Sequence, residues 1–224
     1  MKDFTVLDGR LRTKNELAGR LSPASVWSSV WRLPPLFFQT VDPTPNPLIE
    51  SAVLVPILRR ADGILRAVLV RRSDHGVHGG QIGFPGGKRE SADRSLLETA
   101  LRETHEEIGL TGNRVKVIES LPAVETLTTA YRICPFLARI DPPERWNCSK
   151  EIVEVLEVAV DDLMRPEAHG EDMPDFPEWT GPRPLPFFQL GPNRVWGATY
   201  RILQPLLPRL QADDEASPSS GAEL

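Results

Sequence analysis

The sequence predicts an α/β fold in which a mixed β-sheet lies between helices. Apolar, β-branched runs typical of strands occur along the middle of the chain, together with one strongly periodic helix. This mixture favours a sheet covered by helices on both faces. The 224 residues suit one domain with extensions, and an apolar content of 40% is ordinary for a globular protein.

The two ends of the chain differ from the middle. Residues 1–47 are predicted to form an N-terminal extension that ends in a proline-rich connector, which can be neither helix nor central strand. A helix is predicted within this extension at Ser22–Trp31. Residues 209–224 are rich in acidic residues and serine, and we expect a disordered tail there. The folded domain is therefore expected at residues 48–208.

The predicted strands follow the connector. Val53–Leu58 and Ala67–Val70 flank Asp62-Gly63, which is a good hairpin turn signal. Three later runs are also predicted to be strands, namely Val115–Leu121, Ile133–Ile140 and Ile152–Val160. A second, weaker helical pattern lies near Gly191–Leu207.

The strongest helical pattern covers Ser95–Ile108. A mostly apolar stripe recurs there at helical spacing, at Leu97, Leu101, Thr104 and Ile108. Ser91 or Asp93 is predicted to cap the N-terminus, and Gly109 is predicted to end the helix in the left-handed conformation. The stripe would face the sheet.

Three glutamates lie away from this stripe. Glu103, Glu106 and Glu107 share one face, because residues three and four apart are neighbours on a helix. Like charges there repel by roughly 0.2–0.5 kcal/mol per i,i+4 pair. A hard divalent cation bound by oxygen ligands would offset the repulsion. Arg102 is expected to orient one of the carboxylates. The alternative interpretation is a solvated acidic face.

The loop before the helix is unusually rich in glycine. Five of its nine residues from 79 to 87 are glycine, which permits close approach of the backbone and positive φ. A glycine pair that leads into an acidic helix can also present a carbonyl oxygen to a metal. We therefore include the carbonyl of Gly87, or that of Gly86, among the candidate metal ligands.

Together, the loop and the helix resemble the Nudix box, the signature of hydrolases that cleave a diphosphate linked to another moiety. The chain keeps the family's arginine, glutamates and final glycine and leucine, at Arg102, Glu103, Glu106, Glu107, Gly109 and Leu110. Thr104 replaces an apolar residue, and the spacing from glycine to arginine is one residue longer than in the general pattern. Asp93 then takes the position of the early acidic residue, with a structural role. The resemblance implies a Nudix-type α/β/α sandwich.

The longer spacing is similar to that of the coenzyme A pyrophosphatase branch. The motif that precedes the box in that branch is matched by Arg71, by Gly80 and by the run Phe84-Pro85-Gly86-Gly87. His78 also fits, within a His-x-Gly-Gln pattern. Gly76 stands where the branch has a second arginine, which puts coenzyme A specificity in doubt.

The resemblance and the charge pattern together predict metal-assisted phosphate chemistry. Mg²⁺ or Mn²⁺ can neutralise a diphosphate, orient a water and lower its pKa. The predicted metal ligands are Gly87, Glu103, Glu106 and Glu107, and Arg102 would assist them. One of these glutamates, or the distal Glu151, would orient or deprotonate the water. A solvated residue at a strand entry is the alternative interpretation of Glu151.

Five residues are predicted to bind the substrate. Arg71 and Arg72 follow a strand and could meet an anion through charge-assisted hydrogen bonds, although a solvated sheet edge explains them nearly as well. His78 could donate to a phosphate or satisfy the loop backbone. Gly80 and Phe84 follow from the branch motif.

Three functions are consistent with these residues. The leading hypothesis is hydrolysis of coenzyme A or its thioesters to 3′,5′-ADP and a 4′-phosphopantetheine product. The second keeps the chemistry but changes the substrate to ADP-ribose, a dinucleotide or a dNTP. The third is a non-catalytic Nudix domain that senses a nucleotide, against which the intact set of glutamates argues.

Composition bounds the partners and the location. A net charge of −5 argues against a nucleic-acid-binding surface. Cys134 and Cys148 are too few for a disulfide framework, and no apolar run approaches a membrane span. We expect a cytoplasmic protein whose partner is a small diphosphate. Residues 1–45 could form a lid or a homodimer contact.

Overall fold

The computed structural model describes residues 4–7, 10–13, 48–74, 79–126, 130–174 and 181–216. The chain divides into two compact units, Met1–Pro43 and Thr44–Leu224. In the first unit, β1 (Phe4–Leu7) pairs in antiparallel fashion with β2 (Arg10–Thr13). The helix predicted at Ser22–Trp31 lies outside the described residues.

An eight-stranded sheet forms the centre of the second unit. Its main strands lie in the order β10-β4-β3-β9-β7, with β3 parallel to β9 and the other neighbours antiparallel. Their bounds are Ile49–Arg59 (β3), Leu65–Arg72 (β4), Val115–Ser120 (β7), Tyr131–Ile140 (β9) and Ile152–Ala159 (β10). Three short strands pair with β4, β3 and β9 respectively, namely β5 (Ile82–Gly83), β6 (Gly86–Lys88) and β8 (Val124–Glu125). All the predicted strands are confirmed.

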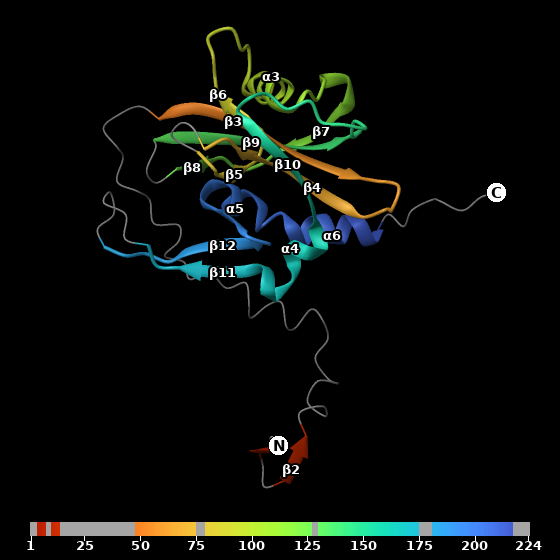
Figure 1. Cartoon of the computed structure of the whole chain (residues 1–224), viewed down its shortest axis with the longest axis vertical. Coiled ribbons are helices and arrows are strands. Elements are labelled where there is room, and N and C mark those ends of the chain that lie inside the picture. The colour runs from red at the N-terminus through yellow and green to blue at the C-terminus, as the bar shows by residue number, and fades with distance from the viewer. Residues whose placement is uncertain are drawn as a thin grey trace, which may run out of the picture. The chain divides into compact units, whose positions relative to one another are not determined.

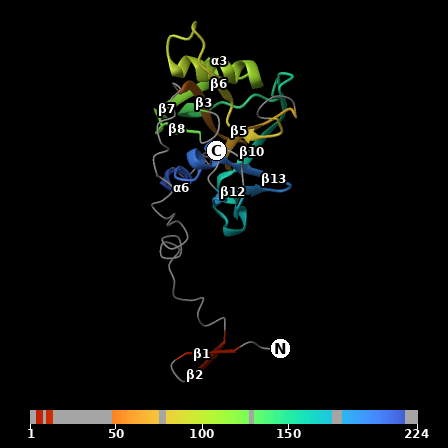
Figure 2. The same ribbon diagram turned by 90° about the vertical axis from the view of Figure 1, so that its left-hand side faces the viewer.

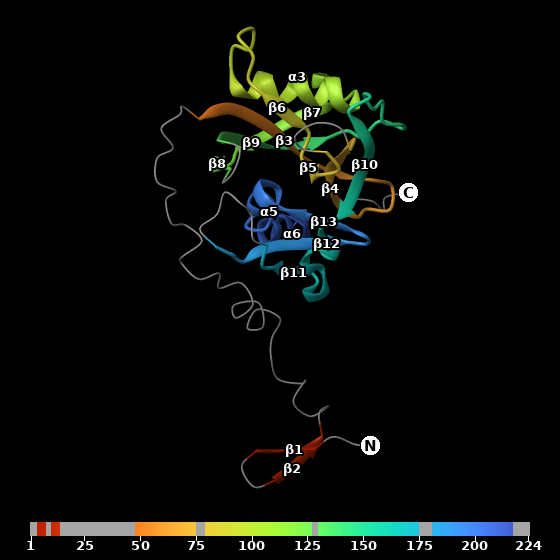
Figure 3. The same ribbon diagram turned by 60° about the vertical axis from the view of Figure 1, so that its left-hand side comes forward.

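Helices lie on both faces of this sheet (Figures 1 and 3). One face is covered by α3 (Leu96–Ile108), which contacts β3, β6 and β9. The opposite side carries α4 (Val160–Met164), α5 (Gly197–Leu203) and α6 (Leu207–Ala216). The predicted α/β architecture with a mixed sheet between helices is confirmed. Among the described residues, no helix is long and apolar enough to cross a membrane.

The core beneath α3 joins the helix to four strands. Ile108 is fully buried and belongs to one cluster with Leu54, Leu58, Val68 and Ala138. Burial of such side chains contributes about 1.5–3 kcal/mol each. This packing fixes α3 across the sheet, and thereby fixes the direction in which its glutamates point.

The caps of α3 differ in part from the prediction. Ser95 caps the N-terminus, because its side chain accepts a hydrogen bond from the Glu98 N–H. The prediction of Ser91 or Asp93 was therefore wrong. The helix begins only at Leu96, and the Asp93 carboxylate instead binds groups of the preceding turn. Gly109 ends the helix with φ 71°, as predicted.

A second sheet was not predicted. Its three antiparallel strands are β11 (His169–Asp172), β12 (Leu185–Leu190) and β13 (Asn193–Trp196), and Figure 2 shows β12 and β13 on the side of the main sheet away from α3. The helix predicted over Gly191–Leu207 is wrong in its first third, because Gly191 (φ 55°) makes the turn into β13. Short 3-10 helices cover Gly112–Arg114 and Pro166–Ala168.

The predicted disorder after residue 208 is also incorrect for the first half of that segment. Helix α6 continues to Ala216. Leu207 and Leu210 are buried, and Arg209 pairs with Glu119 of β7, so the helix is held to the sheet. The acidic composition concealed two leucines spaced three residues apart. The remainder of the predicted tail lies beyond the described residues.

Candidate active site

The site is built where β6 lies against α3. Strand β6 is held by β3, with Gly86 opposite Val53 and Gly87 opposite Ala52. Helix α3 contacts both strands, and Figure 3 shows β6 running directly beneath it. The topology therefore brings the glycine pair to the helix face that carries the glutamates.

Glycine is required at both positions of the pair. Gly86 has φ 149°, and a Cβ there would lie 2.3 Å from the Ala52 carbonyl oxygen. A Cβ on Gly87 would lie 2.5 Å from Cδ of Glu103. Because these positions carry no side chains, β6 can lie close both to β3 and to the Glu103 carboxylate. This agrees with the close backbone approach that the glycine-rich loop predicts.

Glu107 is the buried member of the glutamate set. Its Oε2 accepts a hydrogen bond from the Gly86 N–H at 3.0 Å, and its Oε1 lies 2.7 Å from Nη2 of Arg72. The same Nη2 donates to the Gly86 carbonyl at 2.9 Å. Burial raises the pKa of Glu107 to about 7, although Arg72 and the Gly86 N–H both favour the charged form. Arg72, Gly86 and Glu107 thus form a closed ring of contacts.

Glu103 and Glu106 share a single arginine. Nη1 of Arg102 lies 3.0 Å from Oε1 of Glu103 and 3.2 Å from Oε2 of Glu106. The Glu103 side chain is only 19% exposed whereas that of Glu106 is 56% exposed. Burial raises the pKa of Glu103, against the effect of Arg102. One carboxylate therefore faces the interior and the other faces solvent.

Arg102 is in turn held by Asp93. The Asp93 carboxylate accepts from Nε at 2.9 Å and from Nη2 at 3.0 Å, which is a bidentate pair. It also accepts from the Thr99 hydroxyl and the Glu90 N–H, both at 2.9 Å. Hydrogen bonds from Arg102 hold the pKa of Asp93 well below its usual range. Asp93 thus anchors the arginine, in line with the structural role expected for it.

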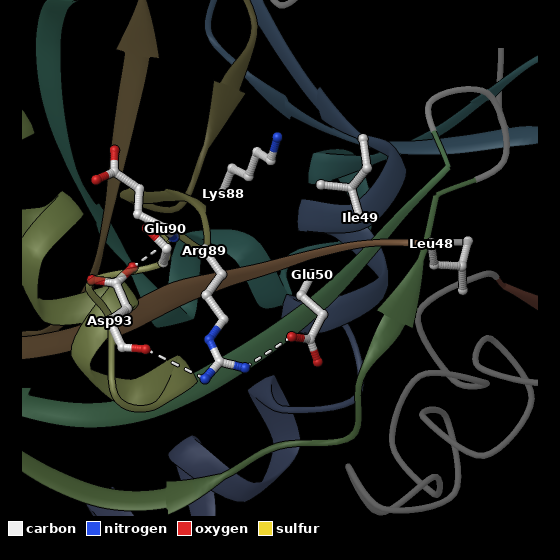
Figure 4. Close-up of a pocket in the computed structure, with 8 residues that line it drawn as sticks. Leu48, Ile49, Glu50, Lys88, Arg89, Glu90 and Asp93 are labelled. Atoms are coloured by element: carbon white, nitrogen blue, oxygen red, sulfur yellow. Dashed lines mark hydrogen bonds and ion pairs between the residues drawn. The ribbon is translucent and has the colours of Figure 1, made fainter. Parts of the chain in front are cut away.

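A hollow of about 450 Å³ is lined in part by Asp93 (Figure 4). Its charged walls are largely paired, because Arg89 donates to the Glu50 carboxylate at 2.9 Å and to the Asp93 carbonyl at 3.3 Å. Lys88 also lines the hollow and has an exposed side chain, while its carbonyl accepts from Arg102. Neither Lys88 nor Arg89 was predicted to belong to the site; their position directly after the glycine pair was the available signal.

The two arginines predicted to bind substrate occupy different environments. Arg72 points at Glu107 and Gly86, with its side chain 27% exposed. Arg71 faces Glu154 across β4 and β10, and Nη2 lies 3.1 Å from the Glu154 carboxylate. Arg72 belongs to the glutamate network, whereas Arg71 makes a cross-strand ion pair near solvent.

The remaining predicted substrate contacts lie in the loop. Phe84 is 3% exposed and belongs to the core, where packing leaves its ring little surface to offer a ligand. Gly80 adopts φ 71° in a turn in which its N–H donates to the Ser73 carbonyl. His78 and Gly76 lie outside the described residues.

Glu151 lies at the entry to β10. Its carbonyl accepts from the Ser73 N–H at 2.7 Å, and the nearby Ser149 N–H donates to the Glu107 carbonyl at 2.9 Å. The backbone before β10 is thus tied to the ends of both β4 and α3. The Glu151 residue itself is exposed.

The carboxylate and carbonyl oxygens of the site suit a hard divalent cation, but in this structure the carboxylates contact arginines. Within the described ranges, no three His, Cys, Asp or Glu side chains are arranged to hold a metal ion. Arg102 bridges Glu103 and Glu106, while Glu107 faces Arg72. Carboxylate and carbonyl oxygens are nevertheless the ligands that Mg²⁺ and Mn²⁺ prefer. The raised pKa values of Glu103 and Glu107 indicate a site where added positive charge would stabilise the ionised forms.

A known protein family and two relatives match this chain. The NUDIX domain family profile matches residues 48–180. The chain is 36% identical over 119 residues to "Uncharacterized Nudix hydrolase NudL" of Enterobacter sp. (strain 638), covering 52% of this chain and 60% of that protein. The protein of the same name from Citrobacter koseri is 36% identical over 121 residues, with coverage of 52% and 60%. The chain thus matches less than two thirds of the length of these relatives.

A solved structure supports the fold. The MutT/nudix family protein from Enterococcus faecalis superposes with a TM-score of 0.51 at 15% identity, covering 91% of this chain and 76% of that one. At this level of identity the likeness concerns the arrangement of helices and strands alone.

Proposed function

Because the chain belongs to the Nudix family, we propose that it is a metal-dependent hydrolase that cleaves the diphosphate bond of a nucleoside diphosphate derivative. The observation that carries the proposal is the contact between the glycine strand and the glutamate face of α3, centred on the buried Glu107. A solvated acidic face would not bury a carboxylate against a backbone N–H and an arginine.

The proposed metal ligands are the carboxylates of Glu103, Glu106 and Glu107 and the carbonyl of Gly87. A bound Mg²⁺ or Mn²⁺ would supply charge neutralisation of the diphosphate and a water of lowered pKa. For the glutamates to bind a cation, Glu103 and Glu106 must exchange contacts with Arg102. Arg102 would keep its place during that exchange, because Asp93 holds it from the other side.

Glu107 and Arg72 have complementary roles in this proposal. Arg72 holds the Gly86 peptide and the Glu107 carboxylate together, so it positions the strand against the helix. We assign Arg72 to positioning rather than to direct contact with substrate. Glu151 is the proposed distal base, since its backbone is tied beside the Glu107 end of α3 while the residue stays exposed.

Coenzyme A or a thioester of it is the proposed substrate, to be cleaved to 3′,5′-ADP and a 4′-phosphopantetheine product. Support comes from the branch motif at Arg71, Gly80 and Phe84–Gly87. Gly76, in place of the branch's second arginine, removes one phosphate contact of that branch, so ADP-ribose, a dinucleotide or a dNTP is the second candidate.

Substrate depletion by the purified chain tests both parts of the proposal. Coenzyme A, ADP-ribose and dNTPs would each be incubated with Mg²⁺ or Mn²⁺, with Glu106→Gln as the inactive control. We expect turnover of coenzyme A that EDTA and Glu106→Gln abolish. Turnover of ADP-ribose alone would reassign the substrate. No turnover of any compound would contradict the hydrolase and favour a nucleotide-sensing domain.

A further inference from the structure

A second hollow lies at the other end of the main sheet. It measures about 470 Å³ and is bordered by the end of β3, the start of β4, the start of β7 and the end of β9. Leu65, on its border, and Arg72, in the glutamate network, are the first and last residues of β4. At 3.3 Å per residue they are about 23 Å apart. The hollow is therefore separate from the candidate active site.

Its border is strongly basic. Four of the lining residues are cationic, Arg59, Arg114, Lys116 and Arg139, against one acidic residue, Asp141. This concentration occurs in a chain with a net charge of −5. The hollow therefore carries a local charge opposite to that of the whole protein, which favours an anionic ligand.

Two of the cations are opposed to each other. Lys116 of β7 and Arg139 of β9 are direct cross-strand partners, and both are exposed. Like charges directly opposite on a sheet are destabilising. Across the described ranges, neither side chain makes an ion pair or a hydrogen bond. A bound anion would supply the missing negative charge between them.

The other two cations already have partners. Arg59 pairs with Asp214 of α6 and donates to the Gly63 carbonyl at 2.6 Å. Arg114 lies 3.6 Å from the Asp141 carboxylate and donates to the Pro142 carbonyl at 3.3 Å. Among the described residues that line the hollow, Lys116 and Arg139 are therefore the cations left to meet a ligand.

The lining also has an apolar part. Ile57 and Leu65 contribute to it and are 4% and 8% exposed. A site with an apolar floor and a few convergent polar groups is typical of small-molecule pockets, whose volumes run from about 300 to 1,000 Å³. The hollow is large enough for a molecule the size of a nucleotide, and not only for an inorganic ion.

We propose that this hollow binds a phosphorylated small molecule of nucleotide size, whose phosphate lies between Lys116 and Arg139 and whose apolar body contacts Ile57 and Leu65. The site is distinct from the glutamates of α3 and does not depend on hydrolysis there. The proposed phosphate position lies between Lys116 and Arg139, which face each other without a partner among the described residues.

Calorimetry with the full chain in EDTA tests the proposal, with AMP, inorganic phosphate and adenosine as probes. The variant is Lys116→Gln/Arg139→Gln, and the matched control is Arg132→Gln, an exposed arginine on the same strand β9 that does not line the hollow. We expect AMP to bind the native chain and the control alike, and to bind the double variant at least tenfold more weakly. Phosphate and adenosine should each bind at least tenfold more weakly than AMP.

Several results would overturn the proposal. These are no AMP binding by the native chain, equal AMP binding by the double variant, and phosphate binding as tight as AMP binding. Circular dichroism and melting of the double variant show whether it is folded, and removal of like charges should not unfold it.

Discussion

The two ends of the main sheet place charge in opposite ways. At the glutamate end, each carboxylate is bound to an arginine or a backbone N–H, as in the ring of Arg72, Gly86 and the buried Glu107. At the basic end, Lys116 and Arg139 face each other without a partner among the described residues. The first arrangement holds its own geometry, whereas the second is complete only with a ligand. Substitutions at the glutamate end should therefore cost activity or stability, and substitutions at the basic end should not.

The largest expected effect is on catalysis at the glutamate end. Glu103→Gln removes a proposed metal ligand, and we expect kcat to fall by about 100-fold or more, since losing even an outer partner of a metal site typically costs 10–100-fold. Steady-state hydrolysis measures the loss, and Mn²⁺ binding followed by electron paramagnetic resonance shows whether the metal is affected. Glu98→Gln, on the first turn of the same helix, is the control and should keep its kcat. Equal losses in both variants would contradict the assignment.

The next effect concerns the glycine strand. Gly86→Ala should lower the free energy of unfolding by about 3 kcal/mol, because the new Cβ meets the Ala52 carbonyl and φ is 149°. Gly112→Ala is the matched control, since a Cβ there has nothing within 4 Å; we expect a change within about 0.5 kcal/mol. Urea denaturation of both variants measures the difference. Equal stability would mean that β6 does not lie against β3 as closely as the structure shows.

Neighbouring arginines on β4 give a third test. Arg72→Met leaves the Glu107 carboxylate buried without its cation, so the free energy of unfolding should fall by about 2 kcal/mol. Arg71→Met breaks an ion pair near solvent and should cost no more than about 0.5 kcal/mol. Urea denaturation of both variants at pH 8 reports both values. An Arg71 variant as unstable as the Arg72 variant would remove the distinction between positioning and solvent-facing arginines.

A paired carboxylate outside the site predicts a pH dependence. The Glu157 carboxylate accepts a hydrogen bond from Arg60 at 3.0 Å and another from the Trp146 indole N–H at 2.9 Å. These bonds, chiefly the one from Arg60, lower the pKa of Glu157 from its ordinary 4.5. A lowered folded pKa means that the ionised carboxylate stabilises the fold above pH 4.5, and that this contribution is lost as the pH falls through the folded value. Glu157→Gln should cost about 1 kcal/mol at pH 7, and the cost should shrink as the pH falls below 4.5. A pH-independent difference would contradict the pairing.

At the glutamate end, the shared helix face and the close approach of the backbone could be predicted because that information is local. Helical spacing alone places Glu103, Glu106 and Glu107 on one face, and the density of glycine predicts the close approach of the backbone. The partners of those groups were harder to predict. The contact of Arg72 with Glu107 depends on the register of β4 against its neighbours, and no spacing along the chain encodes it.

The basic end could not be predicted at all. Arg59, Lys116 and Arg139 are separated by long stretches of sequence, and only the order β3-β9-β7 brings them together. Taken singly in the sequence, each of them is typical of a solvated residue on a strand. The same limitation explains the missed sheet of β11, β12 and β13, whose first two strands are separated by residues 173–184. Composition also misled at α6, where acidic residues concealed a helix held by buried leucines.

The smallest expected effect has the opposite sign, and it separates the two ends most directly. Lys116→Gln removes one of two opposed cations, so the free energy of unfolding should rise by about 0.5 kcal/mol in 20 mM salt. The gain should vanish in 0.5 M KCl, because exposed charges are screened within a few ångströms there. Arg132→Gln on β9 should show neither change. Destabilisation by Lys116→Gln at both salt concentrations would mean that the lysine already stabilises the fold, and the basic end would then resemble the glutamate end instead of contrasting with it.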